Sequence, residues 1–133
     1  MSDLTSLEEG DARILSQGKN ISAFAFSPNG STLAAADRKG EIHRFDPSTG
    51  ESKGVFPSGD AWVPSLIYTP DGQQLIGGGG DGVVRVWQPE TGEVLAAYPL
   101  GKATLFATLT KNGSTLLAQL HRSEIIVLRA NTP

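Results

Sequence analysis

The chain contains no cysteine, so disulfide bonds, thiolate catalysis and cysteine-ligated metal sites are excluded. Charge is also sparse, because Asp, Glu, Lys and Arg make up only 19% of the 133 residues and the formal net charge is -3. So weak a field gives no general attraction to nucleic acid or to an acidic membrane surface. We therefore expect neither as a partner.

Long apolar runs are missing as well. No segment approaches the roughly 20 apolar residues that cross a bilayer. The opening stretch "MSDLTSLEEGDARILSQGKN" has neither the basic start nor the apolar centre of a signal peptide. These features predict a soluble cytoplasmic protein.

Turn-forming residues are abundant instead. There are 16 glycines and 8 prolines, and 38% of the residues are hydrophobic. A globular chain of this length has one core, and so many turns divide it into short elements. We expect a single domain over residues 1–133 with no helical periodicity between its turns.

The sequence repeats itself. Residues 26–51 align without a gap on residues 68–93, at an offset of 42. Gly30 falls on Gly72, and "PSTGE" falls on "PETGE". A weaker third copy begins at Leu109, where Gly113 corresponds to Gly72 at an offset of 41. Because a missed repeat leads to a wrong fold, this period is the first constraint on the architecture.

Each unit has the pattern of four short strands joined by tight turns. The first strands are expected at residues 21–26, 63–68 and 104–109, and the third strands at 41–45, 83–87 and 124–128. A period near 42 residues is typical of four-stranded propeller blades. We assign residues 21–62, 63–103 and 104–133 to three blades, of which the third lacks its fourth strand.

The second copy, "TPDGQQLIGGGGDGVVRVWQPETGE", resembles a WD40 repeat. The resemblance includes the turn around Gly72, the Asp81-Gly82 turn, Trp87 at the end of the third strand, and the "TGE" turn. It implies an all-β propeller in which Gly30, Gly72, Gly113, Asp81, Gly82 and Trp87 have structural roles.

The family's usual hydrogen-bonded chain of His, Ser, Asp and Trp is incomplete here. The Gly-His place is occupied by Gly18-Lys19, Gly59-Asp60 and Gly101-Lys102, and the Ser place of the second copy is Gly77. We therefore expect this network to be absent or replaced.

Three blades do not close a ring, because propellers have about four to eight blades. Residues 8–15 resemble residues 90–97, so the chain begins with the strand that its third copy lacks. Residues 8–20 are therefore expected to form a clasp strand and loop that complete the third blade of another copy. A head-to-tail dimer of six blades is preferred, a trimer of nine is possible, and a fragment of a longer propeller is the alternative.

The run Gly77–Gly80 has the composition of a phosphate-binding loop. Such a loop needs a following helix and often a lysine, whereas this run is followed by the strand pattern "VVRVW". We therefore predict a hairpin corner with an Asp-Gly turn.

Other catalytic patterns are weak. His43 and His121 have no third ligand at metal spacing, and no "GxSxG" motif accompanies the serines. We expect a non-enzyme with no cofactor and no metal. Arg44, where the other copies have Val86 and Val127, is expected either to snorkel from a blade face or to pair at an interface.

Basic residues gather in the loops before the first strands and in the turns between the second and third strands. These loops lie at one end of a propeller and also contain Asp37, Asp60 and Asp81. Trp62 is either an exposed interface anchor or a cover for its own blade edge. The candidate partner-binding residues are Trp62, Lys19, Arg38, Lys39, Lys102 and Arg122.

The favoured function is a protein-interaction scaffold that displays these loops rigidly. A ligand receptor or enzyme that uses the central channel is a second possibility, although the expected innermost strands offer no carboxylate or histidine. A third is an assembly model of propeller architecture, natural or engineered, with no selected ligand.

Overall fold

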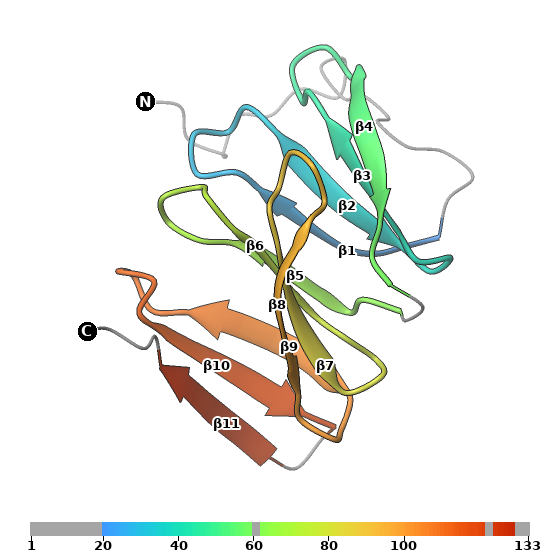
Figure 1. The fold of residues 1–133 in the computed structure, drawn as a ribbon. Coiled ribbons are helices and arrows are strands. Elements are labelled where there is room, and N and C mark those ends of the chain that lie inside the picture. The colour runs from blue at the N-terminus through green and yellow to red at the C-terminus, as the bar shows by residue number, and fades with distance from the viewer. Residues whose placement is uncertain (1–19, 60–61, 122–123, 130–133) are drawn as a thin grey trace, which may run out of the picture.

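The computed structural model describes residues 20–59, 62–121 and 124–129, which form eleven β-strands in three antiparallel sheets (Figure 1). Each sheet is a meander in which consecutive strands are neighbours. The first sheet contains β1 (Ile21–Phe26), β2 (Leu33–Asp37), β3 (Glu41–Phe45) and β4 (Ser52–Pro57).

The second sheet has four strands and the third has three within the described residues. The second contains β5 (Ser65–Tyr68), β6 (Leu75–Gly78), β7 (Val83–Trp87) and β8 (Val94–Pro99). The third contains β9 (Thr104–Leu109), β10 (Thr115–Leu120) and β11 (Glu124–Arg129).

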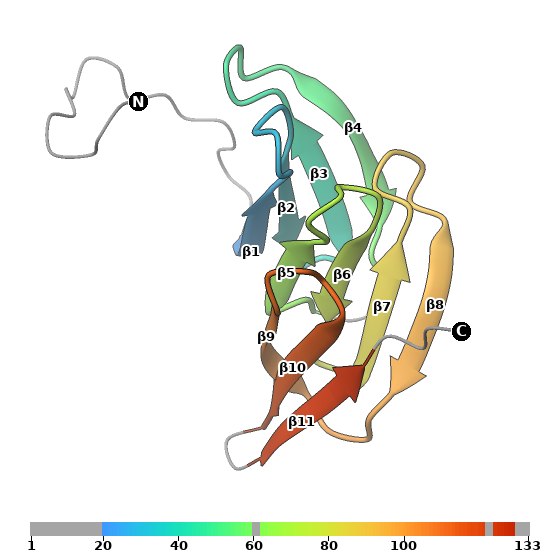
Figure 2. The ribbon, with the colours of Figure 1, turned by 90° about the vertical axis from the view of Figure 1, so that its left-hand side faces the viewer.

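The sheets lie face to face, with their first strands side by side. Strand β1 contacts β5, and β5 contacts β9, so these three strands form the inner edge of the assembly (Figure 2). The all-β architecture of propeller blades, predicted from the repeat, is confirmed. Strand β5 begins at Ser65 rather than Val63, and Pro64 between them has no N–H to donate to a ladder.

The same turn follows the first strand of every blade. The N–H groups of Ser27, Thr69 and Thr110 donate to carbonyls five residues ahead, at 2.9 Å in each case. Gly30, Gly72 and Gly113 adopt φ values of 73°, 74° and 75° at equivalent places. This left-handed conformation explains why glycine recurs there.

One core lies between the first and second blades. The first blade contributes two alanines, Ile42 and Phe56, while the second contributes three aliphatic side chains and Trp87. The Phe56 ring from β4 lies 6.1 Å from the Trp87 ring, measured between centroids. The buried members are Ala34, Ala36, Ile42, Phe56, Val63, Leu66, Leu75 and Trp87.

A second core lies between the second and third blades. Adjacent residues of one strand supply the two cores, because Leu75 faces the first blade and Ile76 faces the third. Its buried members are Ile76, Val84, Val86, Ala107 and Leu116. The middle blade therefore buries both of its faces.

The glycine run is a hairpin corner, as predicted. Gly77 and Gly78 end β6, and Gly79–Gly82 turn the chain into β7. A Cβ atom on Gly77 would lie 2.6 Å from the Trp87 ring, and one on Gly78 would lie 2.7 Å from Thr104 Cγ2. These glycines let large neighbours approach the backbone of β6 closely.

Candidate functional site

Loops from all three blades meet at one end of the molecule in the same way. The N–H groups of Arg38, Gly80 and His121, in the turns after the second strands, donate to carbonyls in the loops before the first strands. The acceptors are Asn20, Trp62 and Ala103, at 2.9, 2.7 and 2.8 Å. This shared bond places the predicted basic loops and turns next to one another within each blade.

Trp62 both covers its own blade and remains accessible. A Cβ atom on Gly80 would lie 2.9 Å from Trp62 Cε3, so the ring covers the β6–β7 turn. The Trp62 side chain is nevertheless 38% exposed. The Arg38 guanidinium of the first blade lies 5.3 Å from the ring centroid, which is cation–π geometry. Trp62 thus links the corresponding turns of two blades.

The other predicted basic residues differ in their surroundings. Lys39 is exposed, whereas Lys102 forms an ion pair with Glu124. Lys19 and Arg122 lie outside the described residues, as does Asp60. The structure brings Arg38 and Trp62 together, and Lys39 follows Arg38 in the same turn. The partner-binding role of these residues stays a prediction.

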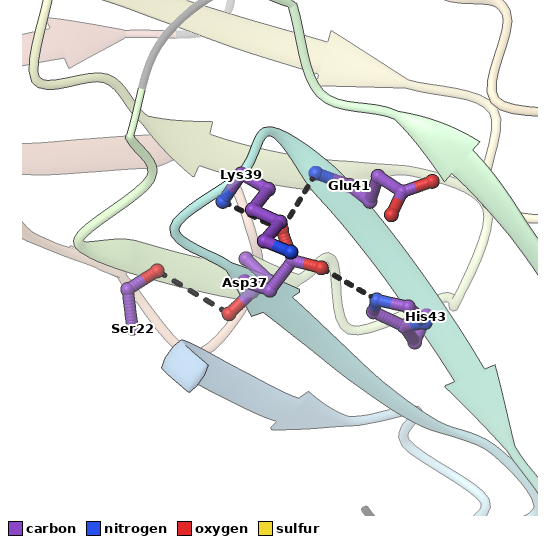
Figure 3. Close-up of polar contacts among 6 residues, drawn as sticks. Ser22, Asp37, Lys39, Glu41 and His43 are labelled. Atoms are coloured by element: carbon purple, nitrogen blue, oxygen red, sulfur yellow. Dashed lines mark hydrogen bonds and ion pairs between the residues drawn. The ribbon is translucent and has the colours of Figure 1, made fainter. Parts of the chain in front are cut away.

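Asp37 is buried rather than displayed on this surface, with 1% of its area exposed. Its Oδ2 lies 2.7 Å from His43 Nε2, and its Oδ1 accepts the N–H groups of Lys39 and Glu41 (Figure 3). Burial alone would raise the pKa of Asp37, but the hydrogen bonds from His43, Glu41 and Lys39 hold it below its ordinary value. The result is a satisfied, buried polar pair.

This pair was missed from the sequence. In the β2–β3 ladder Ala36 pairs with Ile42, so residue 37 at the end of β2 is a diagonal, same-face neighbour of residue 43. An Asp at the end of one strand and a His two residues into the next is the signal that could have identified it. From the sequence, His43 was considered as a possible metal ligand, and Asp37 was not identified as its partner.

Glu41 brings a third donor to this cluster. One ligand atom each from Asp37, Glu41 and His43 lies within 4.8 Å of the other two, a spacing that a metal ion would require. The Asp37 carboxylate is already used by His43 and two backbone N–H groups, however. The geometry therefore fits a structural hydrogen-bond cluster better than a metal centre.

The family's usual polar network is replaced in the second blade. Asp81 forms two hydrogen bonds with the Arg85 guanidinium, and these bonds are the main cause of its lowered pKa. The Trp87 ring lies against Gly77, and its Nε1 has no hydrogen-bond partner in the described part of the chain. Trp87 is therefore held by packing.

The inner strands offer hydroxyl groups but no acid or base. Strands β1, β5 and β9 contain no Asp, Glu, His or Lys. Ser22 Oγ donates to the Val63 carbonyl at 2.7 Å, and Ser65 Oγ accepts the Ala107 N–H at 2.9 Å. Both serines thus join neighbouring blades.

Among the described residues, no helix has the length and hydrophobicity required to cross a membrane.

Comparison with known proteins agrees with this geometry. A family model described as "WD domain, G-beta repeat" matches residues 12–46 and 50–88, which is more than half of the chain. No curated protein matches significantly.

Many solved structures share the fold. The RRP9 WD40 repeats align with a TM-score of 0.80 at 17% identity, covering 91% of this chain and 39% of that one. The U3-55K structure aligns with a TM-score of 0.81 at 18% identity, covering 92% and 40%. The Cps50 (Swd1) propeller domain of Myceliophteria thermophila gives 0.75 at 17% identity, covering 88% and 38%. This chain therefore spans about two fifths of the length of these propellers. It belongs to the WD40 repeat family.

Proposed function

We propose that this chain is a non-catalytic protein-interaction scaffold that works as a closed propeller of two copies joined head to tail. WD40 propellers are commonly interaction scaffolds, which supports the general role. The specific assembly is supported by the composition of the two end faces of the three-blade array.

The open face of the first blade consists of Phe24, Phe26, Leu33, Ala35 and Phe45. Phe24 and Phe26 are 67% and 56% exposed. The equivalent residue to Phe24 in the second blade is Leu66, which is 7% exposed because the first blade covers it. The first blade thus carries an interface face with no blade against it among the described residues. A shallow pocket on this face is lined by Ile21, Phe24, Phe26, Leu33, Ala35 and Phe45.

The open face of the third blade consists of Phe106, Leu117, Ile125 and Val127. Ile125 is 75% exposed and Leu117 is 37% exposed. Their equivalents in the second blade, Val84 and Ile76, are 0% and 7% exposed in the core between the second and third blades. This contrast is the observation that carries the proposal, because exposed apolar faces of this kind mark interaction sites.

The two open faces are the two opposite halves of a blade-to-blade contact. The open face of the first blade is equivalent to the face that the second blade packs against the preceding blade. The open face of the third blade is equivalent to the face that the second blade packs against the following blade. In a head-to-tail dimer, the open first-blade face of each copy packs against the open third-blade face of the other copy. These two equivalent contacts close the ring with two-fold symmetry. Two chains of three blades give six, within the range of about four to eight blades, whereas three chains give nine.

Among the described residues, no strand pairs with the outer edge of β11, and this edge fits the same arrangement. The second family match starts at residue 50 and so includes β4 before the strands of the next blade. The first match starts at residue 12 and so includes residues 12–19 ahead of β1. These residues lie outside the described part of the chain. We propose that they pair with β11 of the other copy and cover its unpaired backbone groups.

Partner proteins would bind at the end that bears Trp62, Arg38 and Lys39. A partly exposed tryptophan beside an arginine is the composition of an interface hot spot. Lys19, Lys102 and Arg122 would extend this surface around the ring.

Quantitative cross-linking of the full chain to its co-purifying proteins tests this surface. We expect Trp62→Ala and Arg38→Gln each to reduce cross-linking of the same proteins by about tenfold, as loss of a hot spot does. Tyr98→Ala is the matched control, because Tyr98 is an exposed aromatic residue on the outer strand β8.

Equal recovery by all the variants would contradict the proposed surface. Trp62→Ala removes the ring that covers Gly80, so it can lower binding by disturbing the fold locally. Arg38→Gln is the second test because Arg38 is exposed. Circular dichroism of each variant establishes that it is folded.

A further inference from the structure

A polar pocket of about 240 Å³ opens at the end of the molecule opposite Trp62. It lies between the first and second blades, under the turns that follow β1, β5 and β7. From the sequence, Gly30 and Gly72 in these turns were expected to have structural roles only. The pocket is complete within one chain, so it does not depend on ring closure. The residues used below are Arg44, Tyr68, Asp71, Gln73 and Glu90.

Arg44 has the only basic side chain among the described residues that line this pocket, and Lys53 Nζ donates to Thr32 Oγ1 at the rim at 2.7 Å. Arg44 Nη2 donates to the Lys53 carbonyl at 2.8 Å, and a Cβ atom on Gly54 would lie 2.8 Å from Nη2. Gly54 therefore leaves the space in which the guanidinium group sits. The bond to Lys53 fixes one side of that group against β4.

One nitrogen of the guanidinium group, Nε, has no hydrogen bond among the described residues. Arg44 Nε is inaccessible to solvent and donates no hydrogen bond to any described residue. No carboxylate in the described part of the chain forms an ion pair with Arg44. Half-buried cations are normally paired, so this one has capacity for an anionic ligand.

The repeat provides an internal comparison. The corresponding pocket between the second and third blades, of about 390 Å³, has Val86 in the place of Arg44 and Leu109 in the place of Tyr68. Its floor is apolar, and it also contains Ile76 and Leu128. The second pocket also has an arginine, Arg129, but Arg129 does not occupy the place of Arg44. The fold therefore tolerates an apolar residue at the Arg44 position, and an arginine at that position is specific to the first pocket.

From this geometry we propose that the pocket binds one carboxylate group of a partner polypeptide, supplied by a Glu or Asp side chain. The Nη N–H groups that do not bond the Lys53 carbonyl would hold the carboxylate oxygens in a charge-assisted contact. The Tyr68 ring would cover the hydrocarbon part of the side chain, and the volume suits a single side chain.

The surrounding charge favours a carboxylate over a phosphate group. Asp71 and Glu90 also line the pocket. The Asp71 Oδ1 atom already accepts hydrogen bonds from Thr69 Oγ1 at 2.7 Å and from the Gln73 N–H at 3.0 Å. Arg44 and the nearby Lys53 together balance the two acidic residues, which leaves no net positive charge. Such a site suits a single negative charge, whereas a phosphate dianion would meet stronger repulsion.

Titration of the isotope-labelled full chain with N-acetyl-glutamate amide tests the proposal by NMR. We expect saturable shifts at the Arg44 Nε–H and at the backbone N–H groups of Gly72 and Gln73, with no change at Gly113 in the other pocket. The isosteric N-acetyl-glutamine amide should bind at least about tenfold more weakly, because it lacks the charge.

Two variants and one competing ligand complete the design. Arg44→Met should lose at least about tenfold in affinity, and Glu90→Gln should gain about twofold, since it removes a like charge from the rim. Equal affinity for the glutamine analogue, or unchanged binding by Arg44→Met, would overturn the proposal. Tighter binding of inorganic phosphate than of the glutamate amide would overturn the assignment to a carboxylate.

Discussion

Asp37 and Asp81 perform the same task in successive blades from different places in the repeat. Asp37 is the last residue of β2, and the equivalent residue of the second blade is Gly79. A Cβ atom on Gly79 would lie 2.4 Å from Asp81 Oδ1, so the Asp81 carboxylate occupies the space of the missing side chain. A carboxylate therefore occupies the same place in both blades, but Asp37 supplies it in the first and Asp81 in the second.

The partners of the two carboxylates are equivalent. Asp37 Oδ1 accepts the Glu41 N–H at 3.0 Å, and Asp81 Oδ1 accepts the Val83 N–H at 3.2 Å. Glu41 and Val83 are 42 residues apart, as are the two side-chain partners, His43 and Arg85. The polar contact therefore recurs in the first two blades from different residue positions, buried at Asp37 and partly exposed at Asp81.

The first prediction concerns Asp37→Asn, which removes the negative charge from the buried pair. We expect a loss of about 1–3 kcal/mol in the free energy of unfolding near neutral pH. Because the folded-state pKa of Asp37 is held below 3.8, its contribution is present above that pH and is lost as the pH falls through the folded-state value. Urea unfolding of both proteins between neutral and acidic pH measures the difference.

The difference between the two proteins should shrink in acid, and a pH-independent difference would contradict this account. Glu93→Gln, at an exposed turn, is the control and should leave the unfolding curve nearly unchanged.

The second prediction concerns the contact between Gly77 and Trp87. The equivalent pairs are Ala35 with Phe45 and Ala118 with Leu128, so a larger ring is matched by a smaller neighbour. Gly77→Ala should cost about 1–3 kcal/mol, because the fully buried Trp87 ring has no room to move.

Trp87→Phe in the Gly77→Ala background should recover part of that loss by reproducing the pair of the first blade. A double-mutant cycle based on denaturant midpoints measures the coupling. Simple additivity of the two single changes would show that the size match has no energetic consequence.

The third prediction concerns the open face of the third blade. Ile125→Arg places a charge on this face, which the proposed dimer would bury, so we expect it to dissociate the dimer into single chains. Leu95→Arg is the matched control, because Leu95 is 45% exposed on the outer strand β8 and away from either open face. Sedimentation velocity compares them, and a sedimentation coefficient shared by Ile125→Arg and the unchanged protein would argue against this interface.

Local patterns in the sequence predict the strands and turns well, because they depend on neighbours along the chain. Gly30, Gly72 and Gly113 mark turns that need a left-handed residue, and Val83–Trp87 has the β-branched composition of a strand. The hairpin at Gly77–Gly80 follows from the strand after it.

Contacts between strands and between blades were harder to predict from the sequence. The Asp37–His43 pair depends on the β2–β3 register, and the pocket around Arg44 depends on turns of the second blade that lie far along the sequence. The contact of Arg38 with Trp62 likewise joins two blades. Composition indicated that these residues were unusual, but only the packing of the blades shows which of them meet.

The mass of the full chain in solution tests the central claim most directly. One chain has a mass of 14.0 kDa, and multi-angle light scattering at micromolar concentration should give twice that value for a single, symmetric species. A monodisperse species with the mass of one chain would contradict the closed two-copy propeller. A mass of three chains would also contradict it and would indicate a nine-bladed ring.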